Sequence, residues 1–415
     1  MLSDETIERV TERLVTRIED INLYIIRKIA KKLKEIRDID PTDAHQLVKI
    51  MQYGGDYDKI VKKLAKITKI NTKEIQKIFK EAAKKDYEFA EQFYKYRNKK
   101  YIPFEENIIL QRQIDAIAVQ TTEQYVNFSK TTGIGFSIRD RENNVIFRSV
   151  TDTYKDSIDR AILSISQGKA SYDEEIYNIM KSIGTSGLKY MDYETGKHRR
   201  LDSSLRMAIK DGLRQLSIEN QMLFGREFDA DGVEITVHGY PAPDHAEVQG
   251  RQFRLDQFDN FQNDKDCVDI TGKVFEAEYD DRDRRSIGQY NCYHGILNII
   301  VGVNKPQYTD EELQKIIDEN EEGFDYEGKH YTLYEGTQLQ RRLEAEIRKQ
   351  KDLQIMAKDG DSDKLAVEAQ KKIDILTQKY NKLSKISKLP TKVQRLQVPD
   401  YREIKLTGNN ASKKR

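Results

Sequence analysis

The chain has 415 residues, of which 34% are charged and 37% hydrophobic, and its formal net charge is +1. A net charge so close to zero excludes strong overall attraction to nucleic acid or to membranes, and leaves only local patches for such partners. Two cysteines argue against a disulfide-stapled secreted protein. No secretory signal is evident, and no apolar run approaches the roughly 18–20 residues of a membrane span. We therefore expect a soluble chain without a membrane anchor, folded in a reducing cytoplasm as about two or three compact units.

The N-terminal region, residues 1–130, has the periodicity of helices. Apolar residues recur every three or four positions, and the helices predicted from them span 3–37, 42–53, 56–68 and 71–97. Pro41 ends the first helix, and Gly54 and Gly55 separate the next two. The apolar stripes are typical of a bundle core, although a partner-binding face uses the same periodicity.

Residues 131–309 are predicted to form a mixed core of helices and short strands. Helices are expected at 153–169, 171–183 and 202–222, and strands at 134–138, 145–147, 188–193, 197–201, 233–238 and 296–303. The first four strands form two hairpins, because polar turns separate the members of each pair. The last strand is a short apolar run typical of a buried strand.

Residues 310–386 are predicted to form an arm made of a helical hairpin, with long charged helices at 334–357 and 363–386. The segment between these helices imitates the start of a calcium loop. Such a loop needs glycine at its sixth position and a carboxylate at its twelfth, which here are Lys364 and Gln370. We therefore interpret this segment as a polar turn.

The last range, 387–415, is predicted to be an extended basic tail. The basic residues of the tail and of the helix end before it are Lys382, Lys385, Lys388, Lys392, Arg395, Arg402, Lys405, Lys413, Lys414 and Arg415. Only Asp400 and Glu403 oppose them. Such a segment could neutralise DNA phosphates, dock on an acidic protein surface, or do neither.

The rarest residue types gather between Val233 and Val303. Three of the six histidines and both cysteines fall in this stretch: His238, His245, Cys267, Cys292 and His294. Zinc prefers histidine and thiolate ligands, whose coordinating atoms lie about 3.5–4 Å apart around the ion. These five residues are therefore the candidate zinc ligands.

The spacing of Cys292 and His294 favours a different interpretation. In a strand, residues two apart have Cα atoms separated by roughly 6.5 Å and parallel side chains. The side chains converge only if the strand breaks, which Gly288 and Gly295 allow. We therefore favour hydrogen-bonded loop and core residues over zinc, over a disulfide to Cys267 and over a Cys292–His294 catalytic dyad. No nucleophile elbow, P-loop or dinucleotide fingerprint occurs, so we expect no catalytic residue and no cofactor, with zinc as the one alternative.

Ten residues of this stretch form two spaced motifs: His238, Pro243, His245, Gln249, Gly250, Gly288, Asn291, Cys292, His294 and Gly302. The motifs resemble those of the phage minor capsid protein 2 family, which belongs with the head-morphogenesis proteins of tailed phages. Weaker similarity at Tyr193 and Gly196, 201–206, 308–313 and 338–348 extends the resemblance, which covers roughly 150–350 well.

The chain departs from the family pattern at four positions. Pro241, Ala242, Val248 and Tyr293 stand where the family has Ala, Arg, Trp and Arg. Losing two arginines weakens any anion-binding or catalytic role inherited from relatives. The resemblance implies a structural component of a phage head, assembled at or near the portal vertex.

The predicted fold is α+β and predominantly helical: a helical N-terminal region, a small mixed α/β core with short hairpins, a C-terminal helical hairpin and an extended basic tail. The expected function is that of a structural, non-enzymatic minor capsid protein. It would bind the portal protein, the major capsid protein or both during head assembly in the host cytoplasm, and remain in the virion, where the tail could touch packaged DNA. Two other functions stay open. One is a zinc-dependent enzyme or toxin-like domain delivered with the virion, and the other is a DNA-binding accessory protein.

Overall fold

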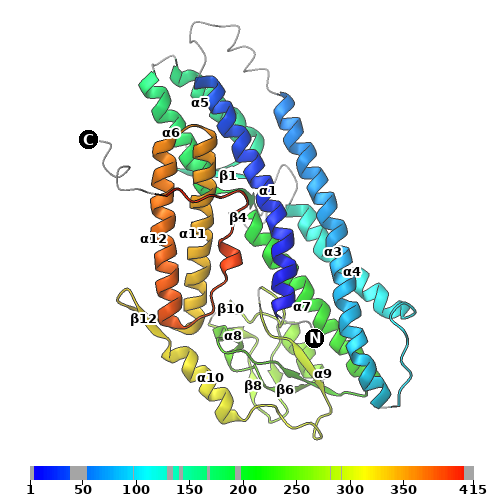
Figure 1. Cartoon of the computed structure of the whole chain (residues 1–415). Coiled ribbons are helices and arrows are strands. Elements are labelled where there is room, and N and C mark those ends of the chain that lie inside the picture. Colours follow the sequence, from blue (N-terminus) through cyan, green and yellow to red (C-terminus); the bar gives the residue numbers. More distant parts are fainter. Residues whose placement is uncertain are drawn as a thin grey trace.

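The computed structural model describes residues 4–37, 54–96, 98–128, 134–139, 144–165, 169–191, 198–280, 282–290 and 292–405. The described chain is predominantly helical with small antiparallel sheets, which is the predicted α+β class. Long helices run side by side along the molecule, and a group of short strands lies with α8 and α9 at one end (Figure 1).

Among the described residues, the N-terminal region consists of the helices α1 (Asp4–Arg37), α3 (Gly54–Tyr96) and α4 (Ile108–Phe128). The bounds of α1 agree with those that its apolar periodicity predicts. The helix predicted at 42–53 lies outside the described residues.

Helix α3 is continuous, so the prediction of separate helices at 56–68 and 71–97 is wrong. No glycine or proline interrupts the sequence between residues 56 and 96. Asn71 disfavours a helix by less than about 0.7 kcal/mol. The burial of Ile75 and Phe79, which are both 0% exposed, outweighs that preference.

The two hairpins predicted in the mixed region are confirmed, and they join into one antiparallel sheet of order β2-β1-β3-β4. The elements here are β1 (Ile134–Arg139), β2 (Val145–Ser149), α5 (Val150–Ile165), α6 (Lys169–Ser186), β3 (Lys189–Met191), β4 (His198–Arg200) and α7 (Leu201–Glu227). Ile134 pairs with Tyr190, which links the two hairpins. Local patterning predicts each hairpin but not this link between them.

A second sheet, of order β11-β5-β6, follows α7. Its region contains β5 (Gly232–Ile235), α8 (Pro243–Ala246), β6 (Gln252–Arg254), α9 (Leu255–Gln262), β7 (Cys267–Val268), β8 (Val274–Phe275), β9 (Glu278–Tyr279), β10 (Arg282–Asp283) and β11 (Ile296–Ile299). The strands predicted at 233–238 and 296–303 are present but shorter. The first ends at Ile235, whose carbonyl accepts a hydrogen bond from Gly250. The second ends in a turn that leaves Val303 71% exposed.

The C-terminal region contains the predicted helical hairpin, α11 (Leu333–Asp359) and α12 (Asp363–Ser387). It is preceded by α10 (Asp310–Glu322), β12 (Phe324–Tyr326) and β13 (Lys329–Tyr331). The segment after α12 is extended apart from the 3-10 helix η1 (Val393–Leu396), and it lies along α11 (Figure 1). Gln370 lies inside α12 and accepts a hydrogen bond from Gln354, so the calcium-like segment is the expected turn.

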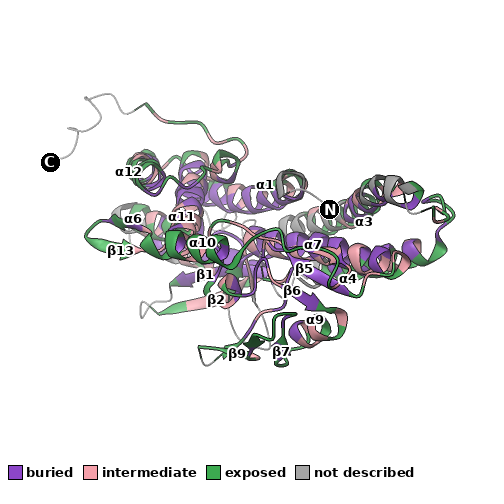
Figure 2. Cartoon of the chain, turned by 90° about the horizontal axis from the view of Figure 1, so that it is seen from below, coloured by how far each residue is buried: buried purple, intermediate pink, exposed green. Residues whose placement is uncertain are grey.

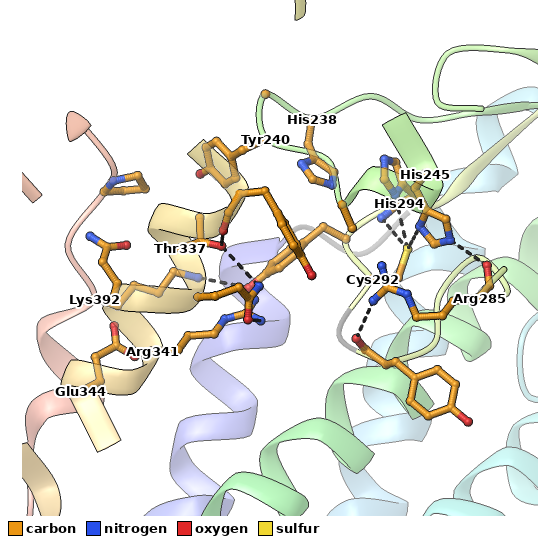
Figure 3. A pocket seen from close by; sticks show the side chains of 18 of the residues that line it. His238, Tyr240, His245, Arg285, Cys292, His294, Thr337, Arg341, Glu344 and Lys392 are labelled. Carbon is orange, nitrogen blue, oxygen red and sulfur yellow. Dashed lines mark hydrogen bonds between the residues drawn. The ribbon is translucent and has the colours of Figure 1, made fainter. Parts of the chain in front are cut away.

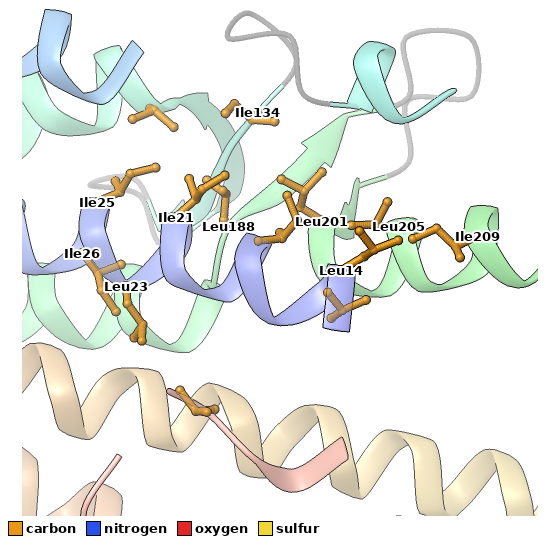
Figure 4. Packing of buried hydrophobic residues seen from close by; sticks show 14 of the residues in the cluster. Leu14, Ile21, Leu23, Ile25, Ile26, Ile134, Leu188, Leu201, Leu205 and Ile209 are labelled. Atoms are coloured by element: carbon orange, nitrogen blue, oxygen red, sulfur yellow. The ribbon is translucent and has the colours of Figure 1, made fainter. Parts of the chain in front are cut away.

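Helix α1 lies inside the largest hydrophobic cluster. It packs against α3, α5, α7 and α11, and its residues Leu14, Ile18 and Ile21 are at most 1% exposed (Figure 4). Fully burying such a side chain stabilises the fold by about 1.5–3 kcal/mol. Figure 2 shows the same organisation, with buried residues on the inward faces of the helices. The cluster draws residues from all four ranges expected from the sequence, whose division at 130, 309 and 386 remains a proposal.

A buried ion network joins α1, α7 and α11. Asp202 accepts from Arg200 Nε at 3.0 Å and from Arg348 Nε at 3.1 Å. Arg200 also pairs with Asp352, while Arg348 lies 3.7 Å from Glu19. All five side chains are less than 10% exposed, so their protonation states depend on one another rather than on water.

The second sheet has a core of its own, much smaller than the first. Phe253 and Phe261 are 0% exposed and anchor it, together with Val233 and Ile296. Long loops connect the short strands around this core. A small core surrounded by loops needs further restraints to hold a single conformation.

Candidate functional site

A cavity of about 450 Å³ lies between the region of the second sheet and the C-terminal hairpin (Figure 3). His238, His245, Cys292 and His294 line one side of it. The other side is formed by α11 and by the segment after α12, which contribute Arg341, Glu344, Lys392 and Arg395 among others. Four of the five candidate zinc ligands thus line one cavity.

Three of these residues, His245, Cys292 and His294, form a tight group that we call the His/Cys cluster. Their ligand atoms lie within 4.8 Å of one another. The Cys292 sulfur is 3.4 Å from His245 Nδ1 and 3.3 Å from His294 Nδ1. All three side chains are buried. The cluster therefore converges on the cysteine sulfur.

Local structure explains how Cys292 and His294 converge although they are two residues apart. The chain around them is irregular, and strand β11 begins only at Ile296. A turn closed by Cys292 N–H on the carbonyl of Gln289 precedes the pair, and the backbone N–H of His294 donates to the Cys292 sulfur at 3.4 Å. The assumption of a strand at this place is wrong, and so is the geometric objection drawn from it.

Helix α8 supplies the third member of the cluster. Pro243 occupies its first turn, where a missing N–H costs nothing, and its fixed φ suits a helix start. The short helix carries His245 back toward the second sheet, where Val248 packs into the core. Asp244, the residue before His245, forms an ion pair with Arg285 at 2.5 Å, which restrains helix α8.

A hydrogen bond at the outer nitrogen orients each imidazole of the cluster. His245 Nε2 donates to the backbone oxygen of Arg285 at 2.6 Å, and His294 Nε2 donates to Gln249 Oε1 at 3.1 Å. That oxygen is the amide acceptor because it also accepts from the backbone N–H of His238. In the neutral rings, both Nδ1 lone pairs therefore point toward the cysteine sulfur.

Burial keeps the cluster uncharged at neutral pH. It lowers the pKa of His245, and it lowers the pKa of His294 well below the usual range, with nearby His238 adding to the effect. Burial also raises the pKa of the Cys292 thiol. A buried thiol with a raised pKa is a poor nucleophile, which argues against the catalytic dyad. Neutral imidazole is the form that binds metals.

His238 and Cys267, the remaining candidates, occupy different places. The His238 ring lies beside that of His294, with centroids 4.3 Å apart, and its Nδ1 is buried without a hydrogen-bond partner among the described residues. Cys267 lies on β7 in the second core, where its sulfur accepts from Arg284 at 3.7 Å. Both cysteines are free, so the disulfide alternative is not formed.

The opposite side of the cavity is rich in cations. Tyr293 Oη accepts from Lys392 Nζ at 3.2 Å. Burial raises the pKa of this phenol, but the charges of Lys210, Lys392 and Arg395 outweigh it and lower the pKa to about 6. The Tyr293 phenol therefore ionises more readily than an unperturbed tyrosine.

The ten basic residues predicted for the tail divide into three groups. Arg395 is buried, and Lys392 is half-buried in the cavity wall. The exposed ones are Lys382, Lys385, Lys388, Arg402 and Lys405. Lys413, Lys414 and Arg415 lie outside the described residues, as does Asn291 of the family motif. Part of the basic tail is therefore an internal element of the fold.

Sequence reasoning missed several residues of this site. Arg285 orients His245 through its backbone oxygen, and a backbone acceptor leaves no trace in residue type. Arg341 and Glu344 could have been identified as candidates from the sequence, because they fall in the 338–348 segment that resembles the family. Only the contact between α11 and the His/Cys loops reveals their place in the cavity.

The family model described as phage minor capsid protein 2 matches residues 2–384. The chain belongs to this family. Membership makes it a structural protein of the phage virion that interacts with other phage head proteins. No curated protein and no solved structure matches the chain. Within the described residues, no helix combines the length and apolar composition needed to cross a membrane.

One departure of this phage minor capsid protein from its family pattern has a local explanation. An arginine in place of Tyr293 would face Lys210, Lys392 and Arg395 at close range. A phenol, which can carry negative charge, suits those neighbours better. The substitution is consistent with the basic segment that packs here in this chain.

Proposed function

We propose that this minor capsid protein binds the portal protein, the inner surface of the capsid or both during head assembly, and that it is retained in the virion. The observation that carries the proposal is the family match over residues 2–384, which includes the helical body, the His/Cys cluster and the C-terminal hairpin. The family role thus applies to the folded body as a whole.

An exposed apolar stripe on α4 supports a protein-binding role. Ile109, Val119 and Val126 are 70%, 44% and 37% exposed. With exposed Ala116, they recur at spacings of seven and three residues, which places them on one face of the helix. The other face of α4 packs on α3 and α7. We propose this outer face as the contact with the portal or capsid.

Crosslinking of purified virions followed by mass spectrometry tests the proposal. We expect peptides of α4 crosslinked to portal or major capsid protein. The substitution Val119→Asp should reduce incorporation into particles, whereas Ile375→Asp, at an exposed apolar position of α12, should leave it unchanged. Absence of the chain from purified virions would overturn the proposal.

Contact with packaged DNA is the second role proposed for the chain, supported by the exposed cations after Lys382. Deleting 387–415 would also remove buried Arg395, so a loss of function could reflect unfolding. Deleting only 406–415 avoids that ambiguity and still removes three basic residues. We expect the shorter deletion to weaken DNA binding and to reduce its salt dependence. Unchanged genome retention and unchanged DNA binding would refute the role.

A further inference from the structure

We propose that the His/Cys cluster is a structural zinc site, with His245 Nδ1, Cys292 Sγ and His294 Nδ1 as ligands and His238 as the fourth. The inference is independent of portal binding, and it concerns what holds the loops of the second sheet together. It follows from hydrogen-bond accounting, from geometry and from the unused nitrogen of His238.

Without a metal, the His/Cys cluster has more hydrogen-bond acceptors than donors. Both Nε2 atoms donate outward, so each Nδ1 is an acceptor that faces the Cys292 sulfur. A thiol has one proton, and it can donate to only one of the two nitrogens. One buried imidazole acceptor is left without a donor, which a folded protein normally avoids. A metal ion bound by the thiolate satisfies both nitrogens at once.

The distances suit zinc. Zinc–sulfur bonds of about 2.3 Å and zinc–nitrogen bonds of about 2.0–2.1 Å, at tetrahedral angles, place sulfur and nitrogen roughly 3.5 Å apart. The two sulfur–nitrogen distances here are 3.4 and 3.3 Å. Thiolate with imidazole is a ligand set typical of zinc. The backbone N–H of His294 that donates to the sulfur would also stabilise a thiolate.

The outer partners complete the arrangement expected of zinc-binding histidines. Such histidines almost always donate their second N–H to a carbonyl, carboxylate or water, which fixes the tautomer. His245 does so to the backbone of Arg285, and His294 does so to the amide of Gln249. The Gln249 side chain, which is the partner of His294, is itself held in place because its Oε1 also accepts from the backbone N–H of His238.

His238 is the side chain that would close the site. It lies outside the group whose ligand atoms fall within 4.8 Å of one another, so its ring must move toward the Cys292 sulfur to bind the metal. Its ring is next to that of His294, and its Nδ1 is buried and unpartnered among the described residues. A four-ligand site is closed to substrate, as structural zinc sites are, whereas a catalytic site keeps one position open. With His238 bound, zinc would tie the loop after β5, helix α8 and the loop before β11 into one unit. This unit forms one side of the cavity.

The test is zinc analysis of the untagged full chain, purified without chelator. We expect about one zinc per chain in the wild type. Changing a second-shell partner typically weakens metal binding about 10–100-fold, so removing a ligand should cost more than that. His245→Ala, Cys292→Ser and His294→Ala should therefore lose the metal. Cys267→Ser is the matched control, since it changes the other buried cysteine and should retain one zinc.

Cobalt titration of the chelator-treated wild-type chain provides a readout that does not depend on the folding of variants. We expect a sulfur-to-cobalt charge-transfer band and visible bands typical of tetrahedral coordination, and a melting temperature that rises when zinc is added back. Absence of bound zinc in the purified chain, together with no uptake of zinc or cobalt, would overturn the site. Zinc that persists in Cys292→Ser would overturn it equally.

The variant His238→Ala decides the fourth ligand. We expect its zinc affinity to fall by more than the 10–100-fold of a second-shell change. Unchanged affinity would overturn the closed, structural site. It would leave a zinc ion with an open position toward the cavity, which is what a zinc-dependent enzyme requires.

Discussion

Arg395 and Glu8 lie 387 residues apart in the sequence and form an ion pair of 2.6 Å between the C-terminal segment and the first helix. The Arg395 side chain is 6% exposed and that of Glu8 is 13% exposed. Lys210 of α7 also binds Glu8, so one carboxylate connects three distant parts of the chain. The C-terminal segment therefore stabilises the fold around the cavity.

Replacing Arg395 with methionine should destabilise the protein by about 3–5 kcal/mol, because it leaves Glu8 buried with a lost partner. The double variant Glu8→Met/Arg395→Met should lose less stability than the sum of the two single changes, since the pair is removed as a unit, but Lys210 then loses its carboxylate partner. Urea denaturation of the four proteins of this double-mutant cycle measures the coupling. Additive effects of the two single changes would show that the pair is not energetically coupled.

The pKa of Glu19 gives a prediction on pH dependence. Burial and the neighbouring charge of Asp202 raise the pKa of this carboxyl to about 8, against 4.5 unperturbed. Between these values the folded chain binds a proton that the unfolded chain has lost. The contribution of Glu19 to stability should therefore fall as pH rises through this window, by up to about 1.4 kcal/mol per pH unit, while Tyr293, whose pKa is lowered to about 6, contributes with the opposite sign above that pH.

The substitution Glu19→Gln removes this titration and keeps the shape of the side chain. We expect the unfolding free energy of the wild type to fall relative to that of the variant as pH rises from 5 to about 8. Denaturation curves at several pH values make the comparison. Glu123→Gln, on the exposed surface of α4, is the control and should follow the wild type. If the Glu19 variant also follows the wild type, Glu19 is not protonated in the folded chain.

The sequence predicted elements well where one pattern persists, and poorly where distant segments meet. The periodicity of α1 and of the C-terminal hairpin predicted their bounds, because a long apolar stripe dominates local preferences. The irregular backbone between Cys292 and Ile296 was not predicted, since it depends on contacts with the loop of His245, which lies 47 residues before Cys292. For the same reason, composition could not show that Arg395 is buried. A run of basic residues predicts a solvent-exposed segment unless its acidic partners elsewhere in the chain are known.

Gly250 illustrates a family-motif residue whose role is conformational. Its φ is +70°, and a Cβ at this position would approach Leu313 Cδ2 to 2.5 Å. Gly250→Ala should therefore destabilise the chain by about 1–3 kcal/mol, through left-handed strain and crowding. Gly239→Ala is the matched control in the same loop region, where a Cβ meets nothing within 4 Å. We expect that change to stay within about 0.5 kcal/mol of the wild type. Equal stability of the two variants would mean that the loop relaxes around Gly250.

The Gln249 side chain contributes both to the stability of the loop that carries His238 and to the proposed zinc site. Its Oε1 fixes the tautomer of His294 and holds the backbone of His238. Gln249→Leu should weaken zinc binding by about 10–100-fold without removing a ligand.

The control is Gln252→Leu, a change at an equally buried glutamine on β6 that bonds Glu234 at 2.8 Å and touches no ligand. Competition with a chromophoric chelator measures both affinities. We expect the control to lose stability while keeping wild-type affinity, because only Gln249 orients a ring that faces the sulfur. Equal affinities of the two variants would show that the imidazole needs no orienting partner.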